Sequence, residues 1–220
     1  MIRFKFTKKG KFKYLSHLDI TRFIIRAIKR AGIEIEYSQG FNPKPKISFS
    51  NPTPLGVESY AEYADAWLKD YLDEKNFKQT LNRELKPELM ITRAANVERK
   101  LPSLMKDIAV ALYVFKIRAG ENMDIDKLEG NILGEPSLKD SIYSMNIREE
   151  NKLLLINLYG YAKLFKNKNN SIFKYNYFYD YFTDIIKNYN ISMVKAIKKE
   201  MFIIREGNLK PPLGILEEGV

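Results

Sequence analysis

The sequence predicts an α+β protein made of two tandem ferredoxin-like units, each with the order β-α-β-β-α-β and an antiparallel sheet. Three observations lead to this prediction. Short segments alternate apolar and polar side chains, other segments repeat apolar residues at helical spacing, and the order of these segments recurs in the second half of the chain. We assign residues 1–100 to the first unit, which carries the motifs described below, and residues 101–220 to the second.

The first unit opens with a strand. Residues 2–6 alternate apolar with basic side chains, which is typical of a strand with one buried face and one basic face. Later segments predict two more strands, a helix capped by Asp73 and a fourth strand. These strands are expected to begin at Ile47, to cover residues 60–68 and to cover residues 90–97.

Signals at both ends bound the first helix. Ser16 fits an N-cap and Asp19 lies three residues on, so their side-chain oxygens can accept hydrogen bonds from amides that the first turn leaves without partners. The helix is therefore expected to begin at His17. Gly32 supplies the left-handed residue that commonly ends a helix.

The second unit follows a polar segment with one proline, residues 98–106, which we interpret as a linker. Alternation and helical spacing then recur in the same order as before. The expected elements are a strand at residues 108–117, a helix at 124–133, two strands within 139–159, a helix at about 175–189 and a strand at 193–204.

Positive charge is concentrated in the first quarter of the chain. Residues 1–50 hold 12 Lys and Arg against 3 Asp and Glu, a net charge of +9, whereas the whole chain carries +10. The first helix has an apolar side and, opposite it, a basic side. A one-sided excess of charge favours an acidic partner, such as nucleic acid or an anionic protein surface. The candidate nucleic-acid-binding residues are Arg3, Lys5, Lys11, Lys13, Arg22, Arg26, Lys29, Arg30, Lys44 and Lys46.

The residue types present exclude several kinds of site. The chain has no cysteine and one histidine, His17, which excludes disulfides, cysteine-ligated zinc, iron–sulfur clusters and multi-histidine metal sites. It contains no nucleophile elbow and no phosphate-binding glycine loop, so we expect binding rather than catalysis, with no metal and no cofactor. No apolar run approaches the roughly 20 residues that span a bilayer. We expect a cytoplasmic protein without a membrane partner.

Residues 38–45 predict a stiff loop. Pro43 and Pro45 each fix a φ angle, and Gly40 permits a turn that a residue with a Cβ would resist. Phe41 and Asn42 are therefore expected in a defined geometry. On turn chemistry alone, packing of Phe41 into the core is equally consistent with the sequence.

The combination of YLSHLD at residues 14–19, YSQGFNPKPK at 37–46 and PLGVES at 54–59 resembles the radical-SAM-linked domain family, a bacterial family of uncharacterised function. Members stand alone or are attached to radical SAM proteins, so the resemblance implies association with a radical SAM enzyme and establishes no reaction. Lys44 stands where the family often has histidine or arginine, so an acid/base role there does not carry over. Because the two motifs occur together in one family, we expect a shared motif cleft formed by Ser16, His17, Asp19, Gln39, Gly40, Phe41, Asn42 and Pro43.

Three functions are consistent with these features. The first is an RNA-binding accessory protein that presents a structured RNA to a radical SAM partner, in RNA or ribosome-related modification. The second is a protein-interaction adaptor for such an enzyme, without RNA contact. The third is a metal-independent RNA-processing enzyme in which His17 or Tyr14 transfers protons. A structural hydrogen bond within the fold is the alternative role for His17.

Overall fold

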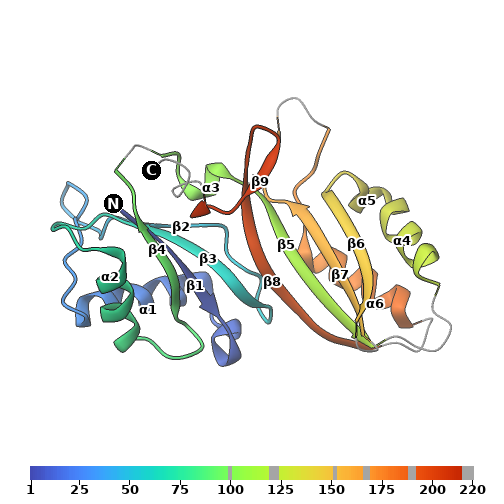
Figure 1. The fold of residues 1–220 in the computed structure, drawn as a ribbon, viewed down its shortest axis with the longest axis horizontal. Coiled ribbons are helices and arrows are strands. Elements are labelled where there is room, and N and C mark those ends of the chain that lie inside the picture. Colours follow the sequence, from blue (N-terminus) through green and yellow to red (C-terminus); the bar gives the residue numbers. More distant parts are fainter. Residues whose placement is uncertain (99–100, 119–123, 151–152, 166–168, 188–191, 215–220) are drawn as a thin grey trace. The chain divides into compact units, whose positions relative to one another are not determined.

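The computed structural model describes residues 1–98, 101–118, 124–150, 153–165, 169–187 and 192–214 (Figure 1). The chain divides into two compact units: unit 1 is Met1–Ile108 with Ile203–Val220, and unit 2 is Ala109–Phe202. Helices α1–α6 occur together with antiparallel strand pairs, which confirms the predicted α+β class. The predicted boundary between residues 100 and 101 stays a prediction.

Unit 1 has the strand order β4-β1-β3, with β2 paired to the other side of β3, and these pairs are antiparallel. One helix lies between β1 and β2 in the sequence and another between β3 and β4. Its elements are β1 (Ile2–Lys8), the 3₁₀ helix η1 (Gly10–Tyr14), α1 (His17–Arg30), β2 (Ile47–Phe49), β3 (Glu58–Ala66), α2 (Glu74–Arg83), β4 (Ile91–Asn96) and α3 (Leu104–Asp107).

Unit 2 has the strand order β8-β5-β7-β6, in which β5–β7 and β6–β7 are antiparallel pairs. Its elements are β5 (Ile108–Arg118), α4 (Ile125–Gly134), α5 (Pro136–Lys139), β6 (Ile142–Glu150), β7 (Leu153–Tyr161), α6 (Tyr175–Lys187) and most of β8 (Ser192–Arg205). The end of β8 belongs to unit 1, where it pairs with β9 (Asn208–Lys210). Residues 99–100, 151–152 and 188–189 of the predicted linker, strand pair and helix lie outside the described residues.

One face of the unit 1 sheet carries the core. Ile2, Phe4 and Phe6 alternate along β1 toward this face, and all three are buried. Helices α1 and α2 supply the other half of the core, where the ring centroids of Phe4 and Phe77 lie 5.4 Å apart (Figure 1). Burying a side chain of this size stabilises the fold by about 1.5–3 kcal/mol. The apolar half of the alternation therefore attaches both helices to the sheet.

The opposite face of this sheet is also covered at Arg3, which corrects the prediction that Arg3 binds nucleic acid from a basic strand face. Arg3 lies directly opposite Asp65 in the β1–β3 register, and their exposed fractions are 0% and 2%. The guanidinium donates to both carboxylate oxygens, from Nε to Oδ1 at 2.8 Å and from Nη2 to Oδ2 at 2.9 Å. Its Nη1 also donates to the carbonyl oxygen of Pro212 at 3.5 Å. Arg3 is thus held inside unit 1 and is not available to a phosphate.

Both predicted ends of α1 are observed. The Ser16 hydroxyl accepts a hydrogen bond from the amide of Asp19 at 3.1 Å and donates one to the Asp19 carboxylate at 2.6 Å. Gly32 has a φ of 68°, and the amide of Ile33 bonds to the carbonyl of Ile28 at 3.2 Å, which is the Schellman ending. The predicted start of the helix at His17 and the predicted role of Gly32 in ending it are therefore both confirmed.

We expect Ser16→Ala to lower the free energy of unfolding of unit 1 by about 1 kcal/mol, because the first turn of α1 loses its side-chain acceptor. Urea unfolding followed by the fluorescence of Trp67 measures this effect, since Trp67 is the only tryptophan of the chain. Ser16→Thr is the matched control, because threonine keeps a hydroxyl that can accept from the Asp19 amide and donate to the Asp19 carboxylate, and it should keep most of the stability. An unchanged urea midpoint in Ser16→Ala would show that the cap contributes nothing.

The predicted linker contains a structured segment. Helix α3 lies within residues 98–106 and continues to Asp107, and its Leu104 is fully buried. This helix contacts β2 and β3. The mainly polar composition of this segment gave no sign that Leu104 would be buried. The short α5 and β9 were also not predicted, because single turns and three-residue strands show no periodicity.

Candidate nucleic-acid interface

Three basic side chains of α1 form an exposed line that we call the basic stripe: Arg22, Arg26 and Lys29. At 100° per residue these positions fall within one narrow sector of the helix, opposite the buried Ile24 and Ala27. Among the described residues, neither Arg22 nor Arg26 forms an ion pair with an acidic side chain. Their charge therefore faces solvent without a neutralising neighbour.

Arg30 is separate from the stripe. Its Nε lies 3.0 Å from Oε2 of Glu84, and its Nη2 donates to the carbonyl of the same residue at 3.0 Å. Glu84 is the C-cap of α2, so this predicted nucleic-acid-binding residue links the ends of two helices. Its charge is partly neutralised in that position.

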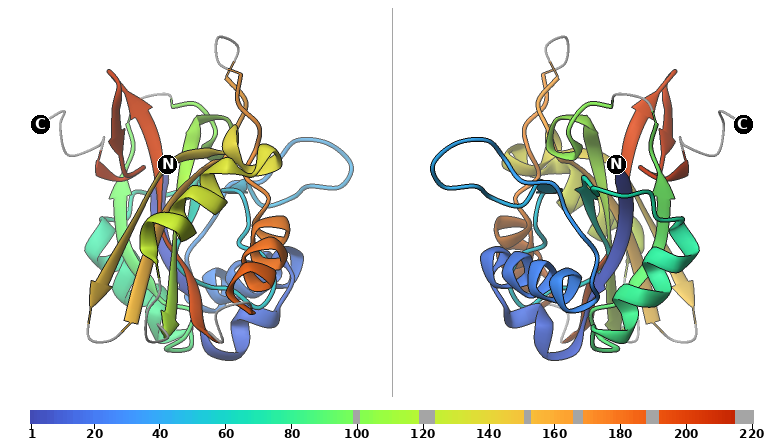
Figure 2. Two further views of the ribbon diagram at one scale, coloured as in Figure 1. Left: turned by 90° about the vertical axis from the view of Figure 1, so that its right-hand side faces the viewer. Right: turned by 90° about the vertical axis from the view of Figure 1, so that its left-hand side faces the viewer.

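Residues 38–45, the GFNP loop, are closed at their base. Tyr37 and Pro45 form an isolated antiparallel bridge, and the amide of Ser38 donates to the carbonyl of Lys44 at 2.8 Å. Figure 2 shows this segment as a loop that projects from the helices and strands of unit 1. Phe41 at its tip is fully exposed, and Gly40 has a φ of 116°, a value that favours glycine. Phe41 therefore faces solvent instead of packing into the core.

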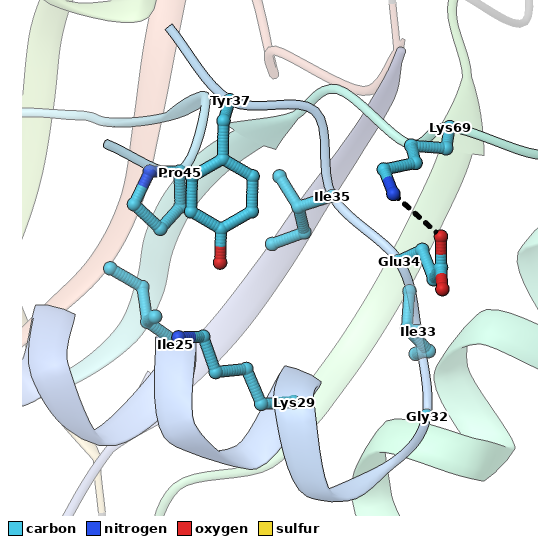
Figure 3. A pocket seen from close by; sticks show the side chains of 9 residues that line it. All are labelled: Ile25, Lys29, Gly32, Ile33, Glu34, Ile35, Tyr37, Pro45 and Lys69. Atoms are coloured by element: carbon cyan, nitrogen blue, oxygen red, sulfur yellow. Dashed lines mark hydrogen bonds and ion pairs between the residues drawn. The ribbon is translucent and has the colours of Figure 1, made fainter. Parts of the chain in front are cut away.

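A pocket of about 300 Å³ lies between α1 and the base of the GFNP loop. The helix contributes Ile25 and Lys29, and the loop base contributes Tyr37 and Pro45 (Figure 3). The Nζ of Lys29 lies 6.0 Å from the centroid of the Tyr37 ring, within the range of a cation–π contact. The remaining lining residues are Gly32, Ile33, Glu34, Ile35 and Lys69.

An ion pair contributes to the lining of the same pocket. The Nζ of Lys69 donates to Oε2 of Glu34 at 2.9 Å (Figure 3). The hydrogen bond, and then the charge of Lys69, lower the pKa of Glu34; the same two interactions raise the pKa of Lys69. Both groups are therefore charged at neutral pH. Together with Lys29, the pocket carries two ammonium groups and one carboxylate.

The other predicted basic residues do not join this region. Lys5 is partly buried, with its Nζ 5.7 Å from the centroid of the Tyr63 ring, on the sheet face that holds Arg3. Lys11 and Lys13 belong to η1, before the first turn of α1. Lys44 is exposed on the GFNP loop, and Lys46 pairs with Glu36 at 2.8 Å. The structure thus brings together the stripe and the loop base and separates them from Arg3 and Lys5.

The predicted motif cleft is not one cleft. His17 lines a small cavity of about 10 Å³ with Phe49, Thr53 and Glu62, and none of its described lining residues comes from 39–43. The ring of His17 makes an edge contact with Phe49, at 5.7 Å between centroids. Lys29, at the loop base, lies about 18 Å from His17 along the helix axis, at about 1.5 Å per residue. The two motifs therefore lie near opposite ends of α1.

The sequence reasoning missed a buried polar group beneath His17. Lys8 and Glu62 are both buried, and the hydroxyl of Thr53 donates to the Glu62 carboxylate. The signal was present: Lys8 is in phase with Phe6, and Glu62 is in phase with Ala64, on the core side of their strands. A cavity of this size admits at most one water, so the group is suited to holding the fold together and not to binding a substrate.

Comparison with known proteins gives the family. A family model described as "Uncharacterized protein conserved in bacteria (DUF2344)" matches residues 1–156. The chain belongs to this family. No curated protein matches it. The DUF2344 description mentions no radical SAM protein, so that association stays a prediction.

A solved structure gives only a weak likeness to this DUF2344 chain. It is the crystal structure of an unknown protein from Galdieria sulphuraria, at 10% identity and a TM-score of 0.28, covering 90% of this chain and 96% of that chain. A TM-score this low carries no argument about fold or function. The basic stripe, the GFNP loop and the pocket all lie inside the region that the DUF2344 model matches. Among the described residues, no helix is long and apolar enough to cross a membrane.

Proposed function

We propose that the protein binds RNA through the basic stripe and the GFNP loop. The observation that carries this proposal is the line of Arg22, Arg26 and Lys29, whose charge leads along α1 to a pocket with an aromatic wall. Basic side chains in a row attract a phosphate backbone and position it, whereas contacts to bases give discrimination. The stripe supplies the first kind of group, and the loop base with its pocket supplies the second.

The geometry favours single-stranded or looped RNA over a regular duplex. The deep, narrow major groove of an RNA helix does not admit side chains, and sequence-specific contacts are usually made to unstacked bases in loops, bulges and ends. Phe41 at the loop tip and Tyr37 at its base offer two exposed aromatic rings for such bases. The RNA-binding surface that we propose is therefore a charged track beside aromatic groups.

A second function, as a protein-interaction adaptor, is favoured by the complete exposure of Phe41. An aromatic side chain on a stiff loop is a common anchor at protein interfaces. The resemblance of the motifs to the radical-SAM-linked family supports a radical SAM enzyme as the partner in either case, in the cytoplasm. Proton transfer by His17 is the least supported of the three functions, because the cavity beside it, at about 10 Å³, is too small for a substrate.

We also propose that both units are ferredoxin-like. The strand order β4-β1-β3-β2 in unit 1 and β8-β5-β7-β6 in unit 2 is the same order when the strands of each unit are counted from its own first strand. Each unit also has helices between its first and second strands and one helix between its third and fourth. These shared features support a repeated β-α-β-β-α-β arrangement.

Reversing two charges of the stripe tests RNA binding. We expect Arg22→Glu with Arg26→Glu to weaken the binding of a mixed-sequence single-stranded RNA by about tenfold or more at low salt, because two phosphate contacts become repulsive. A neutral version, Arg22→Gln with Arg26→Gln, should reduce the slope of log affinity against log salt by about 1.4, since each phosphate contact to a single strand contributes about 0.7. Binding is measured by fluorescence anisotropy over a salt series.

The matched control is Lys75→Glu with Lys78→Glu. Both lysines are exposed on α2 in the same unit, and the substitution changes the net charge by the same amount. If the stripe is the binding surface, this control keeps most of the affinity; if net charge alone attracts RNA, both variants lose it equally. If the wild-type protein binds no RNA at low salt but binds an acidic protein through the same arginines, the RNA-binding proposal is wrong and the adaptor function is supported instead.

A further inference from the structure

We propose that the pocket between α1 and the base of the GFNP loop holds one unstacked base of a bound RNA, with the Tyr37 ring as its stacking wall. This inference rests on the proposed function and assigns it a specific subsite. The stripe would then hold the backbone, and the pocket would hold a base that extends from it.

The size and walls of the pocket suit a single base. Its volume of about 300 Å³ is at the lower end of the range for small-molecule sites, about 300–1,000 Å³. Ile25, Ile35 and Pro45 give it apolar sides, and the Tyr37 ring lies among them (Figure 3). A flat heteroaromatic ring matches such walls, because stacking on an aromatic side chain needs a planar partner of any base type.

Charge explains why a base would be delivered here. Arg22 and Lys29 lie about 10 Å apart along the helix axis, and Lys29 belongs to both the stripe and the pocket. A phosphate backbone held on the stripe therefore passes the pocket mouth at Lys29. Because the lining carries two ammonium groups and one carboxylate, a phosphate next to the bound base meets a net positive charge.

Polar groups in the pocket can also bond the edge of a base. The Tyr37 hydroxyl is directed toward Ile25 and Lys29, inside the ring of lining residues (Figure 3). The ammonium groups can donate hydrogen bonds, and the Glu34 carboxylate can accept them. Bases present both acceptors and donors on their edges, so a pocket with both kinds of group fits them better than it fits a simple anion.

The test compares a short mixed-sequence single-stranded RNA with the same ribose–phosphate strand lacking its bases. Wild type should prefer the strand with bases by about 5- to 150-fold, the range for stacking of one base on an aromatic side chain. Tyr37→Leu should lose the part of this preference that the Tyr37 ring supplies, leaving only what Phe41 contributes, while keeping the wild-type affinity for the strand without bases. Tyr37→Phe, which keeps the ring, should retain most of the preference.

Two further variants separate the pocket from other causes. Ile25→Phe fills the pocket from the helix side without altering Tyr37, and it should also lose the preference. Tyr71→Leu is the matched control, because Tyr71 is an exposed tyrosine of unit 1 that does not line this pocket. Melting of each variant, followed by Trp67 fluorescence, shows whether unit 1 is folded.

The outcomes distinguish the pocket from the proposed function. If Tyr37→Leu and Ile25→Phe are folded and keep the preference for bases, the base is bound elsewhere and the pocket assignment is wrong, although RNA binding stands. If wild type binds both strands equally, the protein holds only the backbone, and the pocket assignment is again wrong. If wild type binds neither strand at low salt, the proposed function and the subsite both fail.

Discussion

Asp65→Ala is expected to lower the free energy of unfolding of unit 1 by about 3–5 kcal/mol, the usual cost of removing one partner from a buried ion pair. The guanidinium of Arg3 is completely buried and donates two hydrogen bonds to Asp65, at 2.8 and 2.9 Å. Without the carboxylate, its third contact, to the Pro212 carbonyl at 3.5 Å, is too long to compensate a buried charge. Urea unfolding followed by Trp67 fluorescence measures the loss.

The double variant Arg3→Met with Asp65→Leu is the control for this prediction. Replacing both members of a buried ion pair with apolar side chains of similar volume is often neutral or stabilising, so the double variant should recover most of the lost stability. If Asp65→Ala lowers the free energy of unfolding by less than about 1 kcal/mol, the Arg3–Asp65 ion pair does not stabilise the pairing of β1 with β3. If the double variant is as unstable as the single one, the cause is lost shape complementarity and not an unpaired charge.

The residues of unit 1 show which features the sequence could predict. Helix α1 was predicted to the residue at its start, because Ser16, Asp19 and Gly32 act within a few residues of the helix ends and need no tertiary partner. The alternation in β1 was also predicted, since period two is local. Local chemistry was therefore sufficient for the element and for its apolar side.

Contacts between residues that are distant in the sequence could not be predicted from local patterns. The alternation that identified Arg3 as facing away from the helices could not show that Asp65 and Pro212 cover it, since these partners are distant in the sequence. The same limit applies to the motif at residues 14–19 and the GFNP loop, because their occurrence together in one family does not show that they are close in the structure. They lie near opposite ends of α1, because the helix extends about 1.5 Å per residue between them.

The candidate site shows the same division. Arg22, Arg26 and Lys29 were predicted as a basic helix side, and this depends only on helical periodicity. The pocket was not predicted, because it needs Ile25 and Lys29 from the helix, Tyr37 and Pro45 from the loop base, and Lys69 from beyond β3. Two of these lining residues, Tyr37 and Pro45, are held next to each other by an isolated antiparallel bridge.

Gly160→Ala is expected to destabilise unit 2 by about 1–3 kcal/mol, the range for overpacking a well-packed core. Gly160 is buried in β7, and a Cβ built on it would lie 2.5 Å from Cγ of Phe173. Phe173 cannot easily withdraw, because its amide is bonded to the carbonyl of Tyr161 at 2.9 Å and its ring lies 5.6 Å from that of Phe178.

Gly130→Ala in the same unit provides the opposite expectation with the same chemical change. Gly130 lies inside α4, where an added Cβ meets nothing within 4 Å, so the methyl group should stabilise unit 2 by about 0.4–1 kcal/mol through the lower entropy of the unfolded chain. Thermal unfolding followed by circular dichroism measures both variants, and Trp67 fluorescence reports unit 1 separately.

A Gly160→Ala protein that melts at or above the wild-type temperature would mean that β7 and Phe173 can move apart, and that the glycine is not required for their close approach. If Gly130→Ala is as destabilising as Gly160→Ala, the effect comes from the loss of glycine in general and not from contact with Phe173.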